Sequence, residues 1–280
     1  MKLGVFEVFA LSDGVFRLDG GQMFGVVPKT LWEKKLPADD LNRVTLGLTC
    51  LLVNAAQHRI LIETGIGDKF DPKFARIYGI NHSKTLLDDL APHGLRPEDI
   101  DIVINSHLHF DHCGWNTRRE GSRTVSTFSR ARYFIQRGEW EHALNPTDRD
   151  QASYIQEFFL AAEKQTEFLE GNQEILPGVR VEILRGHTWN LQGVWLESEG
   201  QSALFISDLV PTAAHLPYPW IMSFDLYPLE TLATRQRLLP KLVEQGTVVV
   251  FPHDARIPWT RLAEVQGKIT MAPLDEGATA

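Results

Sequence analysis

One heptapeptide in the middle of the chain constrains its fold more than any other feature. Residues 106–112 read Ser-His-Leu-His-Phe-Asp-His and come directly after an apolar run. With 10 histidines in 280 residues, such a cluster would arise by chance in roughly one chain per thousand. Side chains alternate along an extended segment, so His107 and His109 are expected to point to the same side, and Asp111 and His112 follow as the chain turns. The motif predicts a metal site at a strand end.

The types of ligand in this motif favour particular metals. Imidazole and carboxylate without thiolate suit zinc, and iron, manganese or cobalt remain possible. Three more candidate ligands, His187, Asp208 and His253, each follow an apolar strand. Strand ends are rigid platforms that can bring distant side chains together. The sequence therefore predicts two divalent metal ions at one site.

The rest of the sequence indicates an α/β protein rich in strands. The expected strands are Leu48–Val53, Arg59–Glu63, Ile100–Ile104, Arg132–Gln136, Val179–Leu184, Gly193–Glu197, Ala203–Ser207 and Thr247–Phe251, with a hairpin connection at Asn54–His58.

Helices are expected over three segments. One begins with Ser83 as its cap and ends at Pro92 and Gly94, and the others span Asp148–Lys164 and Leu229–Glu244. Proline removes a backbone donor and clashes with the preceding turn, so Pro240 should kink or divide the last helix. No Gly/Pro/Ser-rich linker or repeat interrupts the sequence, which predicts a single domain over residues 1–280 with helices outside β-sheet layers.

Charge and composition narrow the class of function. The chain has 28 Lys+Arg against 36 Asp+Glu, so no global field attracts it to nucleic acid or anionic lipid. Prolines within the longest uncharged stretch, Leu209–Phe224, argue against a membrane span. Cys50 and Cys113 are too few for a disulfide framework, and Glu7 and Asp13 interrupt any signal-peptide core, which predicts a cytoplasmic setting. A small-molecule substrate is favoured.

These residues resemble the metallo-β-lactamase superfamily over nearly the whole chain. The resemblance implies an α/β (α+β) fold, a four-layer αβ/βα sandwich with two mixed β-sheets and a binuclear site at strand ends. Seven positions match the family's ligands: His107, His109 and His187 for one ion, Asp111, His112 and His253 for the second, and Asp208 as the bridging carboxylate. Two Zn²⁺ ions are the cofactors most expected.

Three short segments refine the resemblance. Glu63-Thr64-Gly65 is similar to the family's early Asp-Thr-Gly turn, with glutamate in place of aspartate. The residues after His187 are Thr-Trp-Asn-Leu, where many relatives carry Pro-Gly-His around the ligand, which argues against glyoxalase-like subgroups. Segments 19–32 and 208–215 resemble the branch that contains quorum-quenching lactonases and methyl-parathion-hydrolase-like enzymes.

This branch implies hydrolysis of a lactone or ester, with N-acyl homoserine lactone-like substrates favoured. Two dications about 3.5–4 Å apart lower the pKa of water towards neutrality, so the nucleophile is expected to come from solvent. Asp208 is expected to carry a proton to the leaving group, and Asp111 and Asp208 are the predicted catalytic residues. The resemblance alone implies a homodimer.

A substrate pocket is expected within the motif and after Asp208. Its candidate residues are Phe110, His215, Tyr218, Trp220 and Met222. The last four belong to the uncharged run, which either forms an apolar wall for an acyl chain or aryl ester or packs a long loop onto the core. Position 211, where homoserine lactonases usually place a tyrosine that holds the substrate carbonyl, is proline, and Tyr218 is the nearest phenol in the sequence.

Other activities remain open on the same fold. Phosphotriesterase or arylesterase activity would use the same metal site, and β-lactamase activity is less favoured, because fold does not fix function. Flavodiiron proteins usually carry a glutamate where this chain has His109 and append a flavin domain, which disfavours redox chemistry. A binding protein with a vestigial site is disfavoured by the intact set of ligands.

A local basic patch stands out against the acidic whole. Six arginines and one acid lie between Thr117 and Arg137, and the patch spans Arg118–Arg137. It could attract an anionic substrate or a partner subunit, and it keeps a nuclease function open, although the acidic overall charge disfavours nucleic acid. The alternative, which we favour, is a solvated loop whose guanidinium groups pair with distant carboxylates.

Overall fold

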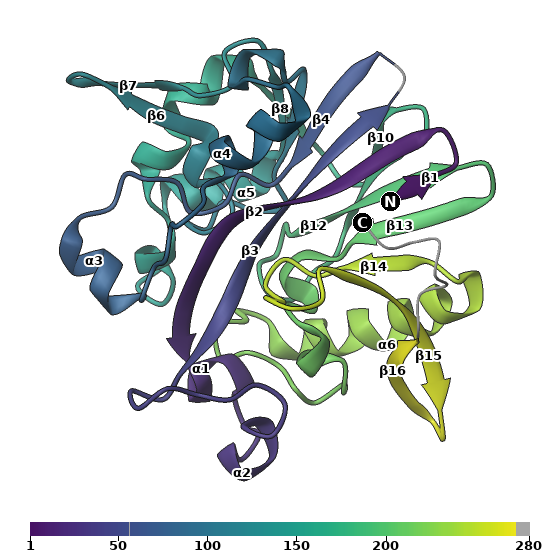
Figure 1. The fold of residues 1–280 in the computed structure, drawn as a ribbon. Coiled ribbons are helices and arrows are strands. Elements are labelled where there is room, and N and C mark those ends of the chain that lie inside the picture. The colour runs from purple at the N-terminus through teal and green to yellow at the C-terminus, as the bar shows by residue number, and fades with distance from the viewer. Residues whose placement is uncertain (56, 273–280) are drawn as a thin grey trace.

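Two seven-stranded β-sheets face one another in the computed structural model, which describes residues 1–55 and 57–272 (Figure 1). The first sheet contains, in spatial order, β1 (Lys2–Leu3), β2 (Phe6–Asp19), β3 (Arg43–Ala55), β4 (His58–Ile62), β5 (Ile102–Ile104), β8 (Arg132–Gln136) and β9 (Thr166–Leu169). The second contains β10 (Gln173–Leu176), β11 (Val179–Ile183), β12 (Gln192–Ser198), β13 (Gln201–Phe205), β14 (Val248–Val250), β15 (Trp259–Val265) and β16 (Lys268–Ala272).

Helices lie outside these sheets. They are α1 (Gly20–Phe24), α2 (Lys29–Trp32), α3 (Pro72–Ile77), α4 (Leu86–Leu90), α5 (Arg137–Leu144) and α6 (Pro228–Gln245). A separate hairpin, β6 (Thr117–Glu120) and β7 (Arg123–Ser126), projects from the body near α4 (Figure 1). Within the described residues, no helix has the length and apolar character needed to cross a bilayer.

Alternating side chains build the layers. In β14, Val248 and Val250 pack into the core between the sheets, whereas Val249 joins the cluster that contains Leu239 and Leu242 of α6. In β5, Ile102 and Ile104 face the core between the sheets, whereas Val103 packs on the opposite face, which α4 covers. Each sheet thus buries both faces, since side chains alternate between faces along a strand.

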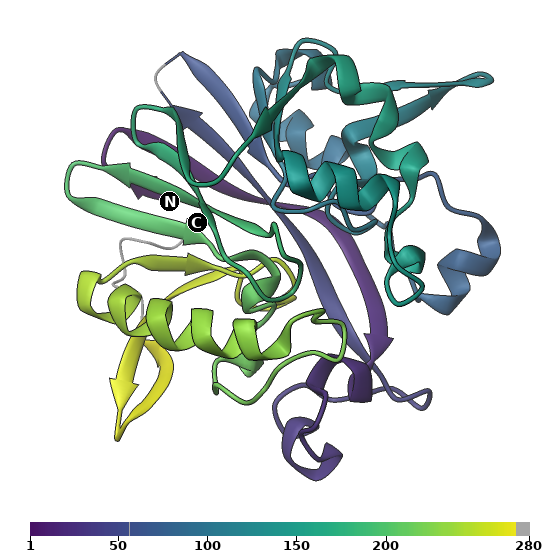
Figure 2. The ribbon, with the colours of Figure 1, turned by 180° about the vertical axis from the view of Figure 1, so that it is seen from behind.

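The result is four layers, with α6 across the outer face of the second sheet (Figure 2). Strands β4, β5, β8 and β9 run parallel, as do β13 and β14, and the other neighbouring pairs are antiparallel. The predicted mixed-sheet sandwich is therefore confirmed. Parallel strands end at the same sheet edge, so the segments that follow β4 and β5, and those that follow β13 and β14, meet there.

Every strand predicted from the sequence is present; β8 has the predicted ends, Arg132–Gln136, and the ends of the others are shifted. Strands β3 and β4 extend into the predicted connection Asn54–His58, of which residue 56 lies outside the described residues. The long strand β2 was not predicted, because Ser-Asp-Gly at 12–14 interrupts its apolar pattern. The structure accommodates that interruption as a register shift between Ser12 and Val15 within one strand.

The helix predicted over Asp148–Lys164 is wrong. The segment forms three short 3₁₀ turns instead, and at Tyr154 the chain is extended, with φ −106° and ψ 110°. Tertiary contacts account for this difference. The Ser153 carbonyl accepts a hydrogen bond from the Phe110 backbone N–H at 2.9 Å, and the Tyr154 hydroxyl donates to Glu139 at 2.9 Å.

The predicted cap at Ser83 is also wrong. Helix α4 begins after Thr85, whose hydroxyl accepts from the Asp88 backbone N–H at 3.2 Å, while the Asp88 carboxylate accepts from the Thr85 N–H at 3.0 Å. The residue three positions after Thr85 is Asp88, whereas the residue three positions after Ser83 is Leu86. The reciprocal capping box therefore forms at Thr85 and not at Ser83.

Helix α6 matches the predicted helix, and Pro240 does not divide it. Leu238, Leu239 and Leu242 pack against the second sheet on either side of the proline. This packing offsets the missing backbone hydrogen bond, because tertiary contacts supply most of the stability of a helix in a protein.

Candidate metal centre

All seven predicted ligands come together at one edge of the sandwich. The loop after β5 carries His107, His109, Asp111 and His112, the loop between β11 and β12 carries His187, the 3₁₀ turn after β13 carries Asp208, and the segment after β14 carries His253. Both sheets therefore contribute, and each ligand lies where a strand has just ended. All of these side chains except that of Asp111 are buried.

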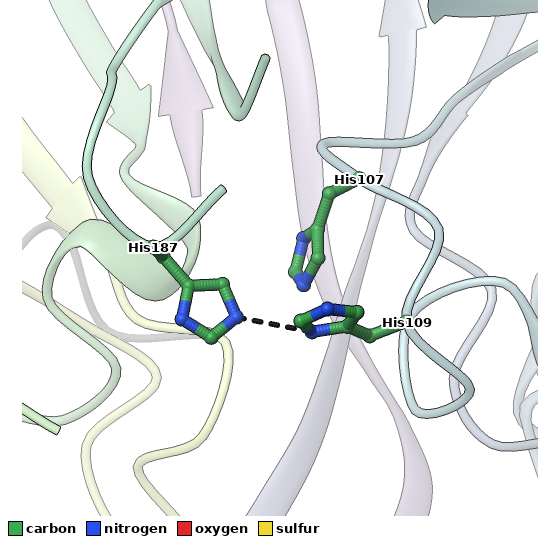
Figure 3. A group of neighbouring side chains, drawn as sticks. All are labelled: His107, His109 and His187. Carbon is green, nitrogen blue, oxygen red and sulfur yellow. Dashed lines mark hydrogen bonds between the residues drawn. The ribbon is translucent and has the colours of Figure 1, made fainter. Parts of the chain in front are cut away.

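Three histidines converge in the first group, which we term the histidine triad: His107, His109 and His187. Figure 3 shows their rings turned towards one another, with His187 reaching across from a loop opposite the other two. His187 Nε2 lies 3.0 Å from His109 Nδ1. The candidate ligand atoms of the triad all lie within 4.8 Å of one another.

The second group, which we term the mixed group, contains Asp111, His112 and His253. Its ligand atoms also lie within 4.8 Å of one another. The two Nε2 atoms of His112 and His253 are 3.1 Å apart, and Asp111 Oδ2 lies 3.5 Å from His253 Nε2. Two imidazoles and one carboxylate thus face a common point.

Asp208 lies between the two groups. Its Oδ2 is 3.4 Å from Nε2 of His187 in the triad. Its Oδ1 is 3.1 Å from Nε2 of His253 and 3.5 Å from Nε2 of His112 in the mixed group. One carboxylate therefore presents an oxygen to each side, as a bridging ligand would.

Contacts on the far ring nitrogens hold two imidazoles of the triad, those of His107 and His187. His107 Nδ1 lies 2.9 Å from Ser106 Oγ, which in turn accepts from the Ser207 hydroxyl at 2.6 Å. His187 Nδ1 lies 3.0 Å from Asp225 Oδ1. Such contacts fix both the orientation and the tautomer of a metal-binding histidine.

The mixed group has comparable supports. His253 Nδ1 lies 2.9 Å from the carbonyl oxygen of Gly47 and must donate to it. Glu63, the residue that departs from the family's aspartate, places Oε1 3.6 Å from His112 Nδ1 and accepts from the Ser106 backbone N–H at 2.9 Å. Glu63 also has a left-handed φ of 65°, which is uncommon for a residue other than glycine and is often associated with functional sites.

Several buried polar atoms at this site fit a bound cation. Across the described residues, His107 Nε2, His109 Nε2 and Asp208 Oδ1 are buried without a hydrogen-bond partner. His253 uses its Nδ1 hydrogen on Gly47, so its Nε2, 3.1 Å from His112 Nε2, is the ring nitrogen left for a metal. Buried polar groups normally have partners, and bound cations would supply them for His107 Nε2 and Asp208 Oδ1, whereas His109 faces the triad through Nδ1. Imidazole and carboxylate donors suit a borderline metal such as zinc.

The electrostatics of the two groups differ. Burial, and then the neighbouring imidazoles, hold the pKa values of His107 and His109 well below the usual range. At His112 burial acts in the same direction, but the carboxylates of Asp111, Asp208 and Glu63 outweigh it and raise the pKa. At His187 burial also acts to lower the pKa, but the carboxylates of Asp208 and Asp225 outweigh it and raise the pKa. Two of the three imidazoles in the triad therefore favour the neutral form, whereas His187 and His112 both lie beside carboxylates.

Three of the five predicted pocket residues share one hydrophobic cluster. Phe110 and Met222 are buried in it, and Trp220 is partly buried against it. Phe110 follows the ligand His109, and its ring packs 5.0 Å from the ring of Tyr78. These side chains lie on the apolar side of the loop that carries the metal motif.

The structure places the other two pocket candidates differently. His215 is fully buried, with Nδ1 2.8 Å from the Thr212 hydroxyl and Nε2 2.9 Å from the Met23 carbonyl oxygen. Burial, together with nearby Arg235, lowers its pKa to about 3, which keeps the ring neutral. Tyr218 packs against the cluster beneath α6 and not against the cluster of Phe110.

The basic patch over Arg118–Arg137 is largely neutralised. Four of its six arginines form ion pairs with glutamates: Arg118 with Glu120, Arg119 with Glu157, Arg132 with Glu167 and Arg137 with Glu170. Three of these glutamates are distant in sequence, as predicted, whereas Glu120 lies in the same hairpin as Arg118. Part of the patch is the β6–β7 hairpin, where the sequence analysis expected a solvated loop.

Several supporting residues were not identified from the sequence. Asp225 is the first carboxylate after the uncharged run, which is a faint signal at best. Glu139 belongs to no motif, Ser106 begins the heptapeptide but was assigned no role there, and Gly47 acts through its backbone carbonyl. Contacts between segments that are distant in sequence leave no local pattern, so only the folded chain reveals these supports.

Comparison with known proteins identifies the same architecture. The family model described as the metallo-beta-lactamase superfamily matches residues 45–253. An N-acyl homoserine lactonase from Bacillus cereus is 26% identical over 224 residues, covering 76% of this chain and 83% of the relative. A second N-acyl homoserine lactonase, from Bacillus thuringiensis, is 25% identical over 232 residues, covering 75% of this chain and 82% of the relative.

Solved structures agree over almost the whole chain. A probable metal-dependent hydrolase from Staphylococcus aureus superposes with a TM-score of 0.91 and 29% identity, covering 98% of this chain and 99% of its own. AidC, a dizinc quorum-quenching lactonase, has a TM-score of 0.83 and 21% identity, with 98% and 96% coverage. At that identity the second likeness concerns the fold alone.

Proposed function

The chain belongs to the metallo-beta-lactamase superfamily, and from this premise we propose that it is a binuclear metal-dependent hydrolase that opens lactones. The favoured substrate class is N-acyl homoserine lactones, on which the curated relatives act according to their names. The observation that carries the proposal is Asp208, which presents one oxygen to each of two ligand groups.

The two proposed ligand sets correspond to two of the three overlapping groups of potential ligands, and the third group, His107, His112 and Asp208, links them. The triad would hold one divalent ion, the mixed group would hold the second, and Asp208 would contribute to both. When bound, a pair of such ions lowers the pKa of a water molecule and polarises a carbonyl oxygen. No serine or cysteine nucleophile is then required.

Two carboxylates have the proposed catalytic roles. Asp208 would contact both ions, and a carboxylate in that position can take a proton from the attacking water and transfer it to the departing alkoxide oxygen. Asp111 is partly exposed beside His253, so it borders the space that substrate would occupy.

The apolar part of the substrate has a proposed wall beside the motif. Phe110, Trp220 and Met222 belong to one cluster, and an acyl chain would pack against such side chains. We leave His215 out of direct contact with substrate, because it is fully buried and both of its ring nitrogens have partners. Tyr218 packs beneath α6, and we do not assign it the role of holding the carbonyl.

The test is acid release from a long-chain N-acyl homoserine lactone, followed with a pH indicator. Protein loaded with Zn²⁺ or Co²⁺ should release acid, whereas the chelated protein and the Asp208→Ala variant should not. Release that is unchanged after complete removal of metal would contradict the proposal. If the fully loaded enzyme releases no acid, the lactone is rejected, and aryl esters and phosphotriesters become the substrates to assay.

A further inference from the structure

A buried carboxylate that no motif identifies lies beside the histidine triad. Glu139, on helix α5, is 1% exposed. Its Oε1 accepts hydrogen bonds from the Leu108 backbone N–H at 3.1 Å and the Tyr154 hydroxyl at 2.9 Å. Its Oε2 accepts from the Thr188 hydroxyl at 2.8 Å. Three donors from three separate segments thus meet on one side chain.

Each of these donors lies next to a triad ligand. Leu108 separates His107 from His109 in the chain, and Thr188 directly follows His187. The Tyr154 ring packs edge-on against the His109 ring, with their centroids 4.7 Å apart. A single carboxylate therefore fixes the backbone or the ring contact of every histidine in the triad.

The hydrogen bonds to Glu139 connect a loop of the first sheet with a loop of the second sheet. Leu108 belongs to the loop after β5 of the first sheet, and Thr188 belongs to the loop between β11 and β12 of the second. Figure 3 shows the two loops approaching the triad from opposite sides. Burial and the Glu139 carboxylate raise the pKa of Tyr154, so its hydroxyl remains a donor.

The mixed group has no such connection. Within the described residues, no hydrogen bond joins Glu139 to Asp111, His112 or His253. Those residues are held instead by Glu63 and by the Gly47 carbonyl. All three donors to Glu139 thus lie beside triad ligands, whereas Glu63 lies beside His112 and also binds the backbone N–H that precedes His107.

We propose that Glu139 is a positioning residue for the triad alone, which sets the two loops so that His107, His109 and His187 converge on one ion. This inference rests on the proposed metal-dependent function. Residues that support metal ligands typically change metal affinity by about 10–100-fold when they are removed. Loss of Glu139 should weaken one ion by that factor and leave the other unchanged.

The experiment measures Zn²⁺ affinity with a competing chromophoric chelator in two backgrounds that each keep one group. His253→Ala breaks the mixed group, so the remaining ion reports the triad. His187→Ala breaks the triad, so the remaining ion reports the mixed group. Adding Glu139→Ala should weaken Zn²⁺ about 10–100-fold in the first background and leave it unchanged in the second.

Two further variants keep the result interpretable. Glu141→Ala makes the same change at an exposed position on the same helix and should alter neither affinity. Thr188→Val removes only one of the three donors and keeps the shape of the side chain. It should weaken the triad ion by a smaller factor than Glu139→Ala, which protects the test if the alanine variant does not fold.

Three outcomes would overturn the inference. Equal weakening in both backgrounds would mean general loosening of the fold, and no weakening in the His253→Ala background would mean that Glu139 does not act on the triad. If Thr188→Val does not change Zn²⁺ affinity in the His253→Ala background, the hydrogen bond between Thr188 and Glu139 does not contribute to metal binding. If the wild-type protein itself binds no Zn²⁺, the proposed function fails first, and that result is distinguishable from the other three.

Discussion

The triad and the mixed group are built from similar ligands but are held in different ways. Side chains hold the triad: Ser106 and Asp225 contact its imidazoles directly, and Glu139 fixes the loops around them. In the mixed group, His253 is held by the backbone carbonyl of Gly47, and only Glu63 supports His112 through a side chain. Substitution should therefore affect the triad more readily than the mixed group.

The difference follows from where the ligands lie in the fold. His187 comes from a loop between antiparallel strands, whereas His253 directly follows the buried strand β14. The Gly47 carbonyl belongs to the long strand β3, so its position is fixed by the sheet. A ligand on a loop needs side chains to hold it, whereas a ligand at a strand end can use the sheet itself.

The largest effect is expected where the groups meet. Asp208→Ala removes the carboxylate that faces both groups, and we expect lactone hydrolysis to fall by about 10²–10⁴-fold, in line with the loss of a positioned acid–base group. Initial rates at saturating metal would measure this loss. Full turnover with both ions bound would show that Asp208 has no catalytic role.

A smaller and selective effect is expected at Asp225. Asp225→Ala removes the partner of His187 Nδ1, so affinity for the triad ion should fall by about 10–100-fold, while the ion in the mixed group is retained. Chelator competition would show one weakened step and one unchanged step. Asp225→Asn, which can still accept a hydrogen bond from the imidazole, serves as the control and should recover part of the loss.

A weaker effect is expected at Gly47. A Cβ atom at this position would lie 3.2 Å from the Ala255 Cα, close to His253, and overpacking of this kind costs about 1–3 kcal/mol. Gly47→Ala should weaken only the ion in the mixed group, by about tenfold. The same chelator titration measures it, and a loss confined to the triad ion would reverse the comparison.

The smallest effect is expected in the basic patch. Arg119 pairs with Glu157 at 2.8 Å on the surface, and exposed pairs contribute about 0–1 kcal/mol to stability. Arg119→Ala should change the free energy of unfolding by no more than that and leave metal affinity and hydrolysis unchanged. Denaturant unfolding and the acid-release assay would measure both, and a large loss of hydrolysis would assign the patch a role in substrate binding.

The ligands could be predicted from the sequence because their pattern is local. Four of them occur in one heptapeptide, and the others each follow an apolar strand whose period is visible in the sequence. The same local information predicted eight of the strands in the described residues, β3, β4, β5, β8, β11, β12, β13 and β14, and the helix α6. An interruption of the apolar pattern within an element predicts a break in that element. Strand β2 was missed for this reason, because the residues between Ser12 and Val15 interrupt its pattern although the strand continues through a register shift.

The supports could not be predicted, because they are tertiary contacts. The segment around Tyr154 has a helical pattern, yet its contacts with Glu139 and the Phe110 backbone hold it in 3₁₀ turns and an extended stretch. His215 is likewise a predicted pocket residue, because it lies in the uncharged run after Asp208, but the Thr212 hydroxyl and the Met23 carbonyl hold its ring nitrogens inside the core. In both cases the partner is unknown until the chain is folded.

The most direct test of the account is an anomalous difference map from crystals grown with Zn²⁺. We expect two peaks per chain, one within reach of His107, His109 and His187, the other within reach of Asp111, His112 and His253, with an Asp208 oxygen near each. A single peak at full occupancy, or peaks away from these seven side chains, would contradict the binuclear site on which the proposed function depends.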